Sequence, residues 1–172
     1  MILMGDEIGR SQGGNNNSWC QNNLLSGMNW DHAQQDLELL EYFKYVIKIR
    51  KKLIHIFNPS SLINNPNHEN IPKYHWHGTK IYSPDWSSWS HTVAFSINKG
   101  KTNPLVWVGL NAYSKSIDFH LPKCEYNWLK VIDTSMSEIF EPLTINENSV
   151  SIKSRSSLLI ISEEVFGTKN KF

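Results

Sequence analysis

The chain has few cysteines, little net charge and no long apolar run, and each of these absences excludes a class of protein. Its two cysteines, Cys20 and Cys124, lie too far apart for a metal or redox motif. The formal net charge of +1 gives no electrostatic basis for binding nucleic acid or a membrane surface. No run approaches the roughly 20 apolar residues of a membrane span, and the N-terminus lacks a signal-type segment. These absences predict a soluble intracellular protein with free thiols.

The composition supports a packed core. Apolar residues make up 40% of the chain and aromatic residues 12%, which argues against global disorder. A length of 172 residues suits one domain, or one modest domain with part of another. The basic cluster Lys48–Lys52 falls at the predicted end of a helix, where cations complement the helix dipole. We therefore interpret this cluster as a solvated helix end.

The first 58 residues follow the pattern of one β/α unit. Residues 1–8 open with an apolar run that predicts a strand buried on both faces, and residues 9–30 form a loop rich in Asn and Gly. Asp31 and Gln34 predict a helix start by a capping box. Apolar residues mostly three or four positions apart predict that this helix continues: Leu37, Leu40, Phe43, Ile47 and Ile54.

The pattern changes after this helix. Residues 58–72 are dense in turn-forming residues and predict a linker. Beyond the linker, short runs rich in β-forming residues predict strands at about 92–97, 105–110, 117–121, 128–132 and 157–161. Gly100 lies near the predicted turn of a hairpin between the first two. Several short strands without a helical pattern predict an antiparallel β-sandwich, with Trp107 and Trp128 in its core.

Two groups of motifs stand out along the chain. The first is Gly5-Asp-Glu-Ile-Gly-Arg10 with Gly14-Asn-Asn-Asn-Ser-Trp-Cys-Gln21-Asn22. The second includes Trp76-His77-Gly78, Pro84-Asp85-Trp86-Ser87 and Val131-Ile132-Asp133-Thr134. In this order they closely resemble isoamylase-type debranching enzymes of the α-amylase superfamily. The details are most similar to bacterial glycogen-debranching enzymes and to plant or cyanobacterial isoamylases.

The resemblance implies an α/β barrel remnant followed by an all-β antiparallel sandwich. It places residues 1–58 at the end of the (β/α)8 catalytic barrel, as its last strand, loop and helix. Residues 59–72 become a linker, 73–164 the C-terminal β-sandwich and 165–172 a tail. The family hydrolyses α-1,6 branch points of glycogen or starch, so the implied partner is a branched α-glucan. The implied location is the cytoplasm, or the plastid in a plant, and no metal or cofactor is implied.

The resemblance also implies that the chain holds no catalytic residue. The nucleophile Asp, the general-acid Glu and the third Asp of the family all precede the segment that begins here. Retaining hydrolysis needs two carboxyl groups about 5–5.5 Å apart. Asp6 and Glu7 are adjacent, and in a strand they would point to opposite faces. We therefore expect the C-terminal part of a debranching hydrolase that is inactive alone.

The loop after the predicted strand offers groups that suit sugar binding. Arg10 supplies a fork of hydrogen-bond donors, the asparagines supply amides, and the tryptophan supplies a flat apolar face. Asn and Gly clusters are also common turn chemistry, and Glu7 would equally serve to anchor its own loop. The expected substrate-binding residues in the complete enzyme are Glu7, Arg10, Asn15, Asn16, Asn17 and Trp19.

The aromatic and histidine residues before the sandwich strands leave alternatives open. Trp76, Trp86 and Trp89 would either seal the sandwich against the barrel or form an aromatic platform for glucan. The second alternative makes the chain a non-catalytic glucan-binding or scaffolding module. His75 and His77 have the spacing of a minimal metal pair but lack further ligands, so we expect a structural, hydrogen-bonded pair.

Overall fold

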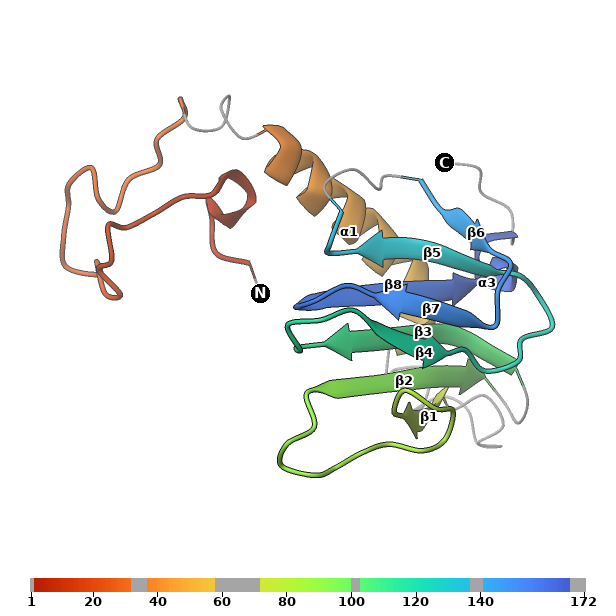
Figure 1. The fold of residues 1–172 in the computed structure, drawn as a ribbon. Helices are drawn as coiled ribbons and strands as arrows, with labels where there is room; N and C mark the ends of the chain where they lie inside the picture. The colour runs from red at the N-terminus through yellow and green to blue at the C-terminus, as the bar shows by residue number, and fades with distance from the viewer. Residues whose placement is uncertain (1, 32–36, 58–71, 100–102, 137–140, 168–172) are drawn as a thin grey trace, which may run out of the picture. The chain divides into compact units, whose positions relative to one another are not determined.

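The structure is a computed structural model that describes residues 2–31, 37–57, 72–99, 103–136 and 141–167 (Figure 1). The chain forms two compact units, Met1–Lys48 and Ile49–Phe172. The boundary between these units lies inside helix α1 (Leu37–Phe57), and the predicted domain limits stay a prediction. None of the described helices is long and apolar enough to cross a membrane.

The second unit contains an antiparallel β-sandwich (Figure 1). Six strands form one sheet in the order β1-β2-β3-β8-β5-β6, and β4 pairs with β7 in the other. The strands are β1 (Pro72–His77), β2 (Thr92–Lys99), β3 (Asn103–Asn111), β4 (Ile117–His120), β5 (Trp128–Asp133), β6 (Leu143–Ile145), β7 (Ser149–Ile152) and β8 (Ser156–Ser162). The predicted sandwich, its five predicted strands and the pairing of β2 with β3 are therefore confirmed. Gly100, at the predicted turn, lies outside the described residues.

The main core lies between the two sheets. Trp107 on β3 meets Phe119 on β4 edge to face, with ring centroids 5.9 Å apart, and both side chains are fully buried. Trp128 also lies in this core, so the prediction for both tryptophans is confirmed. The remaining members of the buried cluster are Ala94, Leu121, Ile152, Leu158 and Ile160.

On the other face of the six-stranded sheet, the side chains are buried at one end and exposed to solvent at the other. Successive residues of a strand point to opposite faces, so Val93, Leu110 and Ser157 share the face away from the main core. They are direct cross-strand partners on β2, β3 and β8 and form one row. Leu110 is 38% exposed, whereas Ile97 and Val106, which pair with each other further along β2 and β3, are fully buried. One end of this face is therefore open to solvent.

The helix predicted after the N-terminal loop forms as α1, and it buries other side chains than the apolar row that predicted it. Its buried side chains are Tyr45, Ile49 and Leu53, which repeat at four-residue steps. Leu40 and Phe43 are only half-buried, and Leu37, Ile47 and Ile54 are exposed. The helix carries apolar residues on two sides, so their spacing alone does not select the side that packs. Asp31 lies in a turn, and Gln34 of the predicted capping box lies outside the described residues.

The strand predicted at residues 1–8 does not form in the structure. Asp6–Ile8 form a short 3-10 helix, η1, and Ile2–Met4 are exposed. A strand buried on both faces requires hydrogen-bonded neighbours for its backbone. Neither β1 nor β6, the edge strands of the described sheet, pairs with this segment. Asp6 and Glu7 therefore lie in a helical turn rather than on opposite faces of a strand.

The predicted tail begins inside a helix. The short helix α3 (Glu163–Gly167) follows β8 directly, which corrects the predicted tail at residues 165–167. On α3, the Phe166 ring lies under the Lys52 ammonium of α1, whose Nζ is 4.1 Å from the ring centroid. A cation over an aromatic face is attracted by the ring quadrupole. Residues 58–71 of the predicted linker and 168–172 of the tail lie outside the described residues.

A chain of buried hydrogen bonds joins β1 to β2. His77, 1% exposed, lies 3.0 Å from Ser96 Oγ through its Nε2. Its Nδ1 accepts a hydrogen bond of 2.9 Å from the Tyr82 backbone N–H, so the neutral ring carries its proton on Nε2. Ser96 Oγ in turn donates to Asn98 Oδ1 over 3.3 Å. These bonds give His77 a structural role, and its hydrogen-bond partners among the described residues are Ser96 and Tyr82 rather than His75.

This environment predicts a loss of stability in acid. Burial, with a smaller contribution from His75, lowers the pKa of His77 from 6.5 to about 4. The unfolded chain therefore binds a proton between these values that the folded chain does not, and the free energy of unfolding falls as pH decreases from about 6.5 to about 4. The loss is up to about 3 kcal/mol. Urea unfolding at several pH values measures it.

The matched variant is His77→Gln, whose side chain does not titrate. We expect it to be less stable than the natural chain at pH 7 but to show a shallower decline towards pH 4. An equal decline in both proteins would show that other groups cause the acid loss.

Candidate functional site

Arg10 holds the N-terminal loop together from inside. Its Nε donates to the Gly27 carbonyl over 3.1 Å and its Nη2 to the Ser26 carbonyl over 2.9 Å. Its Nη1 donates to the Met4 carbonyl over 3.4 Å. The Arg10 side chain passes close to Gly5, which has φ 100°. A Cβ at this position would lie 2.6 Å from Arg10 Cδ, so only glycine leaves room for the side chain. The donors predicted to contact sugar are thus committed to the loop backbone in this structure.

The other predicted polar residues mostly make local turns. Glu7 Oε2 accepts a hydrogen bond of 3.0 Å from the Gly5 N–H. Asn15 Oδ1 accepts from the Asn17 N–H over 2.9 Å, and Asn17 Oδ1 accepts from the Trp19 N–H over 3.3 Å. These bonds are typical of Asn in turns. They fix the backbone that presents the tip of the loop.

Trp19 and Asn16 are presented to solvent at the tip. The Trp19 side chain is 94% exposed, and Asn16, three residues before it, is exposed as well. Among the described residues, no hydrogen-bond or ring partner is found for either side chain. Of the six predicted substrate-binding residues, these two are therefore the ones with side chains free to meet a ligand.

Replacing Arg10 should loosen this loop without affecting the sandwich. In Arg10→Ala the three carbonyl contacts are lost, so we expect chymotrypsin to cut near Trp19 and Leu24 several-fold faster. The unfolding midpoint of the β-sandwich should stay unchanged, because the loop belongs to the other compact unit. Arg50→Ala, which removes an exposed cation from α1, is the control. Equal cleavage rates in both variants would contradict the structural role given to Arg10.

A cluster of aromatic side chains lies on β1, β2 and the connection between them. The Trp76 ring meets Trp86 edge-on at a centroid distance of 5.4 Å and Phe95 at 5.5 Å. Tyr74 lies 6.1 Å from Phe95. Except for Phe95, these side chains are substantially exposed, as is Trp89 on the same connection. Such exposure is required whether the tryptophans pack against a barrel or form a platform for glucan.

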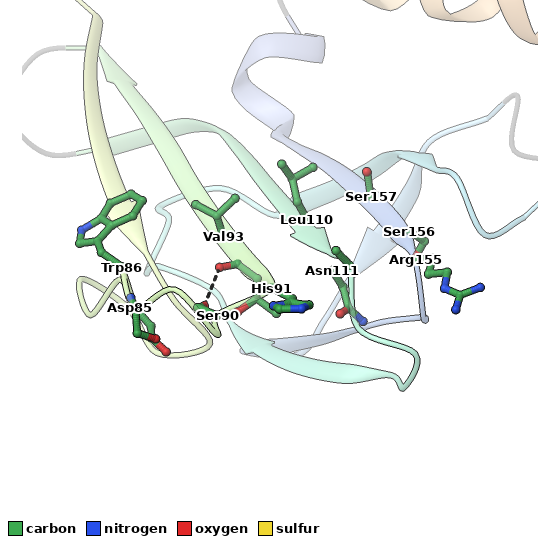
Figure 2. A pocket seen from close by; sticks show the side chains of 13 residues that line it. Asp85, Trp86, Ser90, His91, Val93, Leu110, Asn111, Arg155, Ser156 and Ser157 are labelled. Carbon is green, nitrogen blue, oxygen red and sulfur yellow. Dashed lines mark hydrogen bonds between the residues drawn. The ribbon is translucent and has the colours of Figure 1, made fainter.

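An open pocket of about 680 Å³ adjoins this cluster (Figure 2). Three segments line it: the connection from Asp85 to the start of β2 at Val93, the end of β3 at residues 110–112, and residues 155–157 at the start of β8. In Figure 2, Val93, Leu110 and Ser157 project from one side of the sheet, between Trp86 and Arg155. The volume is within the usual range for small-molecule sites.

Asn111 braces the wall of this pocket. Its Nδ2 lies 2.8 Å from the Lys115 carbonyl and 3.0 Å from the carbonyls of both Ile152 and Lys153. Its Oδ1 accepts from the Tyr113 N–H over 3.0 Å. Because the side chain is 2% exposed and fully engaged, it ties the β3–β4 and β7–β8 loops together rather than serving a ligand.

The ionisable groups of the pocket differ in chemistry. Asp85 Oδ1 accepts from the Ser87 N–H over 3.0 Å, and hydrogen bonds from Ser87 lower the pKa of this carboxyl. The His91 ring stacks on Tyr113 with centroids 5.0 Å apart. Arg155 has φ 51°, and its backbone N–H donates to the Tyr113 carbonyl. The pocket therefore combines one carboxylate, one imidazole and one guanidinium with an indole.

This arrangement suits binding better than hydrolysis. Glycoside hydrolysis requires two carboxyl groups on either side of the bond, and Asp85 is the only carboxylate among the pocket's lining residues. Among the described residues, no group of three or more His, Cys, Asp or Glu side chains is placed to hold a metal ion. Of the pocket, sequence analysis singled out the motif that contains Asp85, Trp86 and Ser87. It gave no binding role to His91, Asn111 or Arg155, whose segments meet only in the folded sheet.

Comparison with known proteins identifies relatives named isoamylase or glycogen debranching enzyme. Isoamylase 1, chloroplastic, from Oryza sativa subsp. japonica is 32% identical over 145 residues, which cover 84% of this chain and 17% of the relative. The glycogen debranching enzyme of Yersinia enterocolitica is 28% identical over 145 residues, covering 84% of this chain and 20% of the relative. The chain thus spans about a fifth of the length of these relatives.

Solved structures and a family comparison agree with this result. Pullulanase from Bacillus acidopullulyticus superposes with a TM-score of 0.60 at 20% identity, over 92% of this chain and 18% of that chain, which supports the fold. The family described as isoamylase 1-3, C-terminal, matches residues 75–165. Because this match includes more than half of the chain, the protein belongs to the isoamylase 1-3 C-terminal family.

Proposed function

We propose that the chain is the C-terminal part of a debranching glycoside hydrolase that cleaves α-1,6 bonds in branched glucans. The family match over residues 75–165 carries this proposal. The alignments with the rice and Yersinia enzymes cover 84% of the chain, more than the β-sandwich alone supplies. They therefore extend into the N-terminal segment, so both parts of the chain resemble the same enzymes.

In this proposal the two parts have different tasks. Residues 1–58 supply the end of the catalytic barrel, with α1 as its last helix, and residues 73–164 supply the sandwich that braces it. The exposed apolar side of α1, at Ile47 and Ile54, is suited to packing against further barrel helices.

The substrate-binding role belongs to the N-terminal loop. Trp19 and Asn16 would contact the glucan directly, since the loop exposes both side chains. Glu7, Arg10, Asn15 and Asn17 would position the loop through the hydrogen bonds described above. The proposed location is the cytoplasm, or the plastid in a plant, since the rice relative is named chloroplastic.

The chain alone should not hydrolyse glycogen, because the pair of catalytic carboxylates and the barrel that positions them are not supplied by the described residues. The test incubates the purified 172-residue chain with glycogen and measures the release of linear glucans by reducing ends. We expect no release above a control without protein. Release that increases with protein concentration would contradict the proposal.

A second candidate function is a non-catalytic glucan-binding or scaffolding module. The exposed aromatic cluster and the adjoining pocket favour it, since neither needs a catalytic partner to be formed. The two candidates differ in whether the chain acts joined to a catalytic barrel. Co-sedimentation of the chain with glycogen tests binding, and the sequence encoded upstream tests the connection to a barrel.

A further inference from the structure

We propose that the pocket beside Trp86 is a glucan-binding site on the β-sandwich, separate from the N-terminal loop. The class of ligand, an α-glucan segment, rests on the proposed function. The site itself rests on the geometry of three segments: the β1–β2 connection, the end of β3 and the start of β8. It would hold a branched polysaccharide on the sandwich without cleaving it.

Trp86 provides a fixed stacking surface. Its side chain is 66% exposed, yet its ring meets the Trp76 ring edge to face at 5.4 Å. Trp76 is fixed in turn against Phe95 on β2. A supported indole loses little conformational entropy when a ligand covers it, so it binds better than a freely rotating ring. The apolar face of a sugar ring suits such a surface.

The floor of the pocket is a short apolar strip that ends in a hydroxyl. Val93, Leu110 and Ser157 are direct cross-strand partners, so the row spans roughly 10 Å at the usual strand spacing. Figure 2 shows Trp86 beyond one end of this row and Arg155 beyond the other. A ligand lying along the row would therefore meet apolar contact first and polar groups at the far end.

The polar groups at the rim suit neutral hydroxyls. Asp85 accepts hydrogen bonds, and its carboxyl is ionised at neutral pH like that of any exposed Asp; hydrogen bonding from Ser87, whose N–H donates to Oδ1, lowers its pKa further. Arg155 only donates, and no described hydrogen bond engages its exposed guanidinium. One group of each sign leaves no net charge to favour an anionic or a cationic ligand. Vicinal hydroxyls both donate and accept, so a sugar satisfies both groups.

The mixed lining also distinguishes this pocket from a protein-docking patch. The core of a protein interface is depleted in charged residues, whereas here Asp85 and Arg155 lie among the lining residues of the same pocket as Leu110. Tyr113 and Asn111 keep the pocket in shape from beneath, through the stacked His91 ring and the tied loops. The pocket is thus formed before any ligand arrives.

The test measures how glycogen cast into a native gel retards the full 172-residue chain. The chain carrying Trp19→Ala, which removes the exposed ring of the N-terminal loop, is the starting protein. We expect it to be retarded still, and we expect the further change Trp86→Ala to weaken retardation about five-fold or more. Trp86→Phe should give an intermediate value. Trp89→Ala is the matched control, because Trp89 is exposed on the same connection but does not line the pocket.

Two further measurements complete the design. Maltohexaose should compete with glycogen, and cellohexaose should not, if the site recognises an α-glucan. Circular dichroism should show that Trp86→Ala folds, since that side chain is mostly exposed. Loss of all retardation with Trp19→Ala alone would overturn the proposal, as would equal retardation of the Trp86→Ala and Trp89→Ala proteins. The proposed debranching role does not depend on this result, because hydrolysis and upstream sequence test it separately.

Discussion

Trp107→Ala is expected to lower the free energy of unfolding by about 3–5 kcal/mol, the usual cost of deleting a large buried side chain. Trp107 is fully buried between the sheets and meets Phe119 edge to face. Its ring also lies over Gly109, where a Cβ would collide with it and with Ile152. Neighbouring side chains from both sheets would have to shift to fill the space. Equilibrium urea unfolding followed by circular dichroism measures the change.

A pair of milder variants tests the reason for this loss. Trp107 Nε1 has no hydrogen-bond partner among the described residues, so Trp107→Phe removes volume but no hydrogen bond. Trp128 Nε1 donates to the Pro122 carbonyl over 3.1 Å, so Trp128→Phe loses a buried bond as well. We expect Trp128→Phe to cost about 1 kcal/mol more than Trp107→Phe. A loss under about 1 kcal/mol in Trp107→Ala would contradict the assignment of Trp107 to the core.

Asn111→Asp is expected to lower the free energy of unfolding by about 3 kcal/mol or more, although the side chain barely changes size. The Asn111 amide nitrogen faces three carbonyl oxygens, those of Lys115, Ile152 and Lys153. An aspartate oxygen in its place is an acceptor among acceptors, and its charge would be buried without a partner. The loops that it joins would separate.

The control for this change is Asn146→Asp. Asn146 is exposed, and no described hydrogen bond engages its side chain, so we expect a change within about 0.5 kcal/mol. Urea unfolding at pH 7 compares the two. The glycogen-gel assay should also show weaker retardation of Asn111→Asp, because the pocket wall moves. Equal stability of the two Asn variants would show that the three-carbonyl arrangement does not hold in solution.

The strands that the sequence predicts share one property. The segments at 92–97 and 105–110 are short runs rich in large apolar and β-branched residues, which is typical of strands. Both segments form strands in the structure. The missed strands lack this signal. β1 alternates aromatic with His and Lys side chains behind a proline, and β6 is three residues long and pairs only at a sheet edge. β7 is four residues long, and only two of them are apolar.

Elements that depend on distant partners could not be predicted in the same way. Helix α1 was predicted from its spacing, but both of its sides carry that spacing, and only tertiary contacts select Ile49 and Leu53. The apolar run at residues 1–8 was predicted as a strand, yet a strand exists only beside another strand. In both cases the local sequence shows which apolar residues could be buried. Whether they are buried depends on the segment that packs against them.

The candidate sites show the same limit. The donors of Arg10 were correctly identified as a fork, but the sequence does not reveal that backbone carbonyls 16 and 17 residues away engage them. The pocket beside Trp86 is lined by segments that meet only because β2, β3 and β8 are neighbours. Trp86 stands in a short motif of the sequence, whereas nothing in the local sequence around Arg155 indicates a site.

The most direct test of the proposed function is the nucleotide sequence immediately upstream of the Met1 codon, read in the same frame. The proposal predicts an open frame that encodes earlier barrel strands together with the nucleophile Asp, the general-acid Glu and the third Asp of the family. A stop codon directly upstream, or an unrelated sequence in frame, would contradict the claim that the chain works as part of a debranching hydrolase.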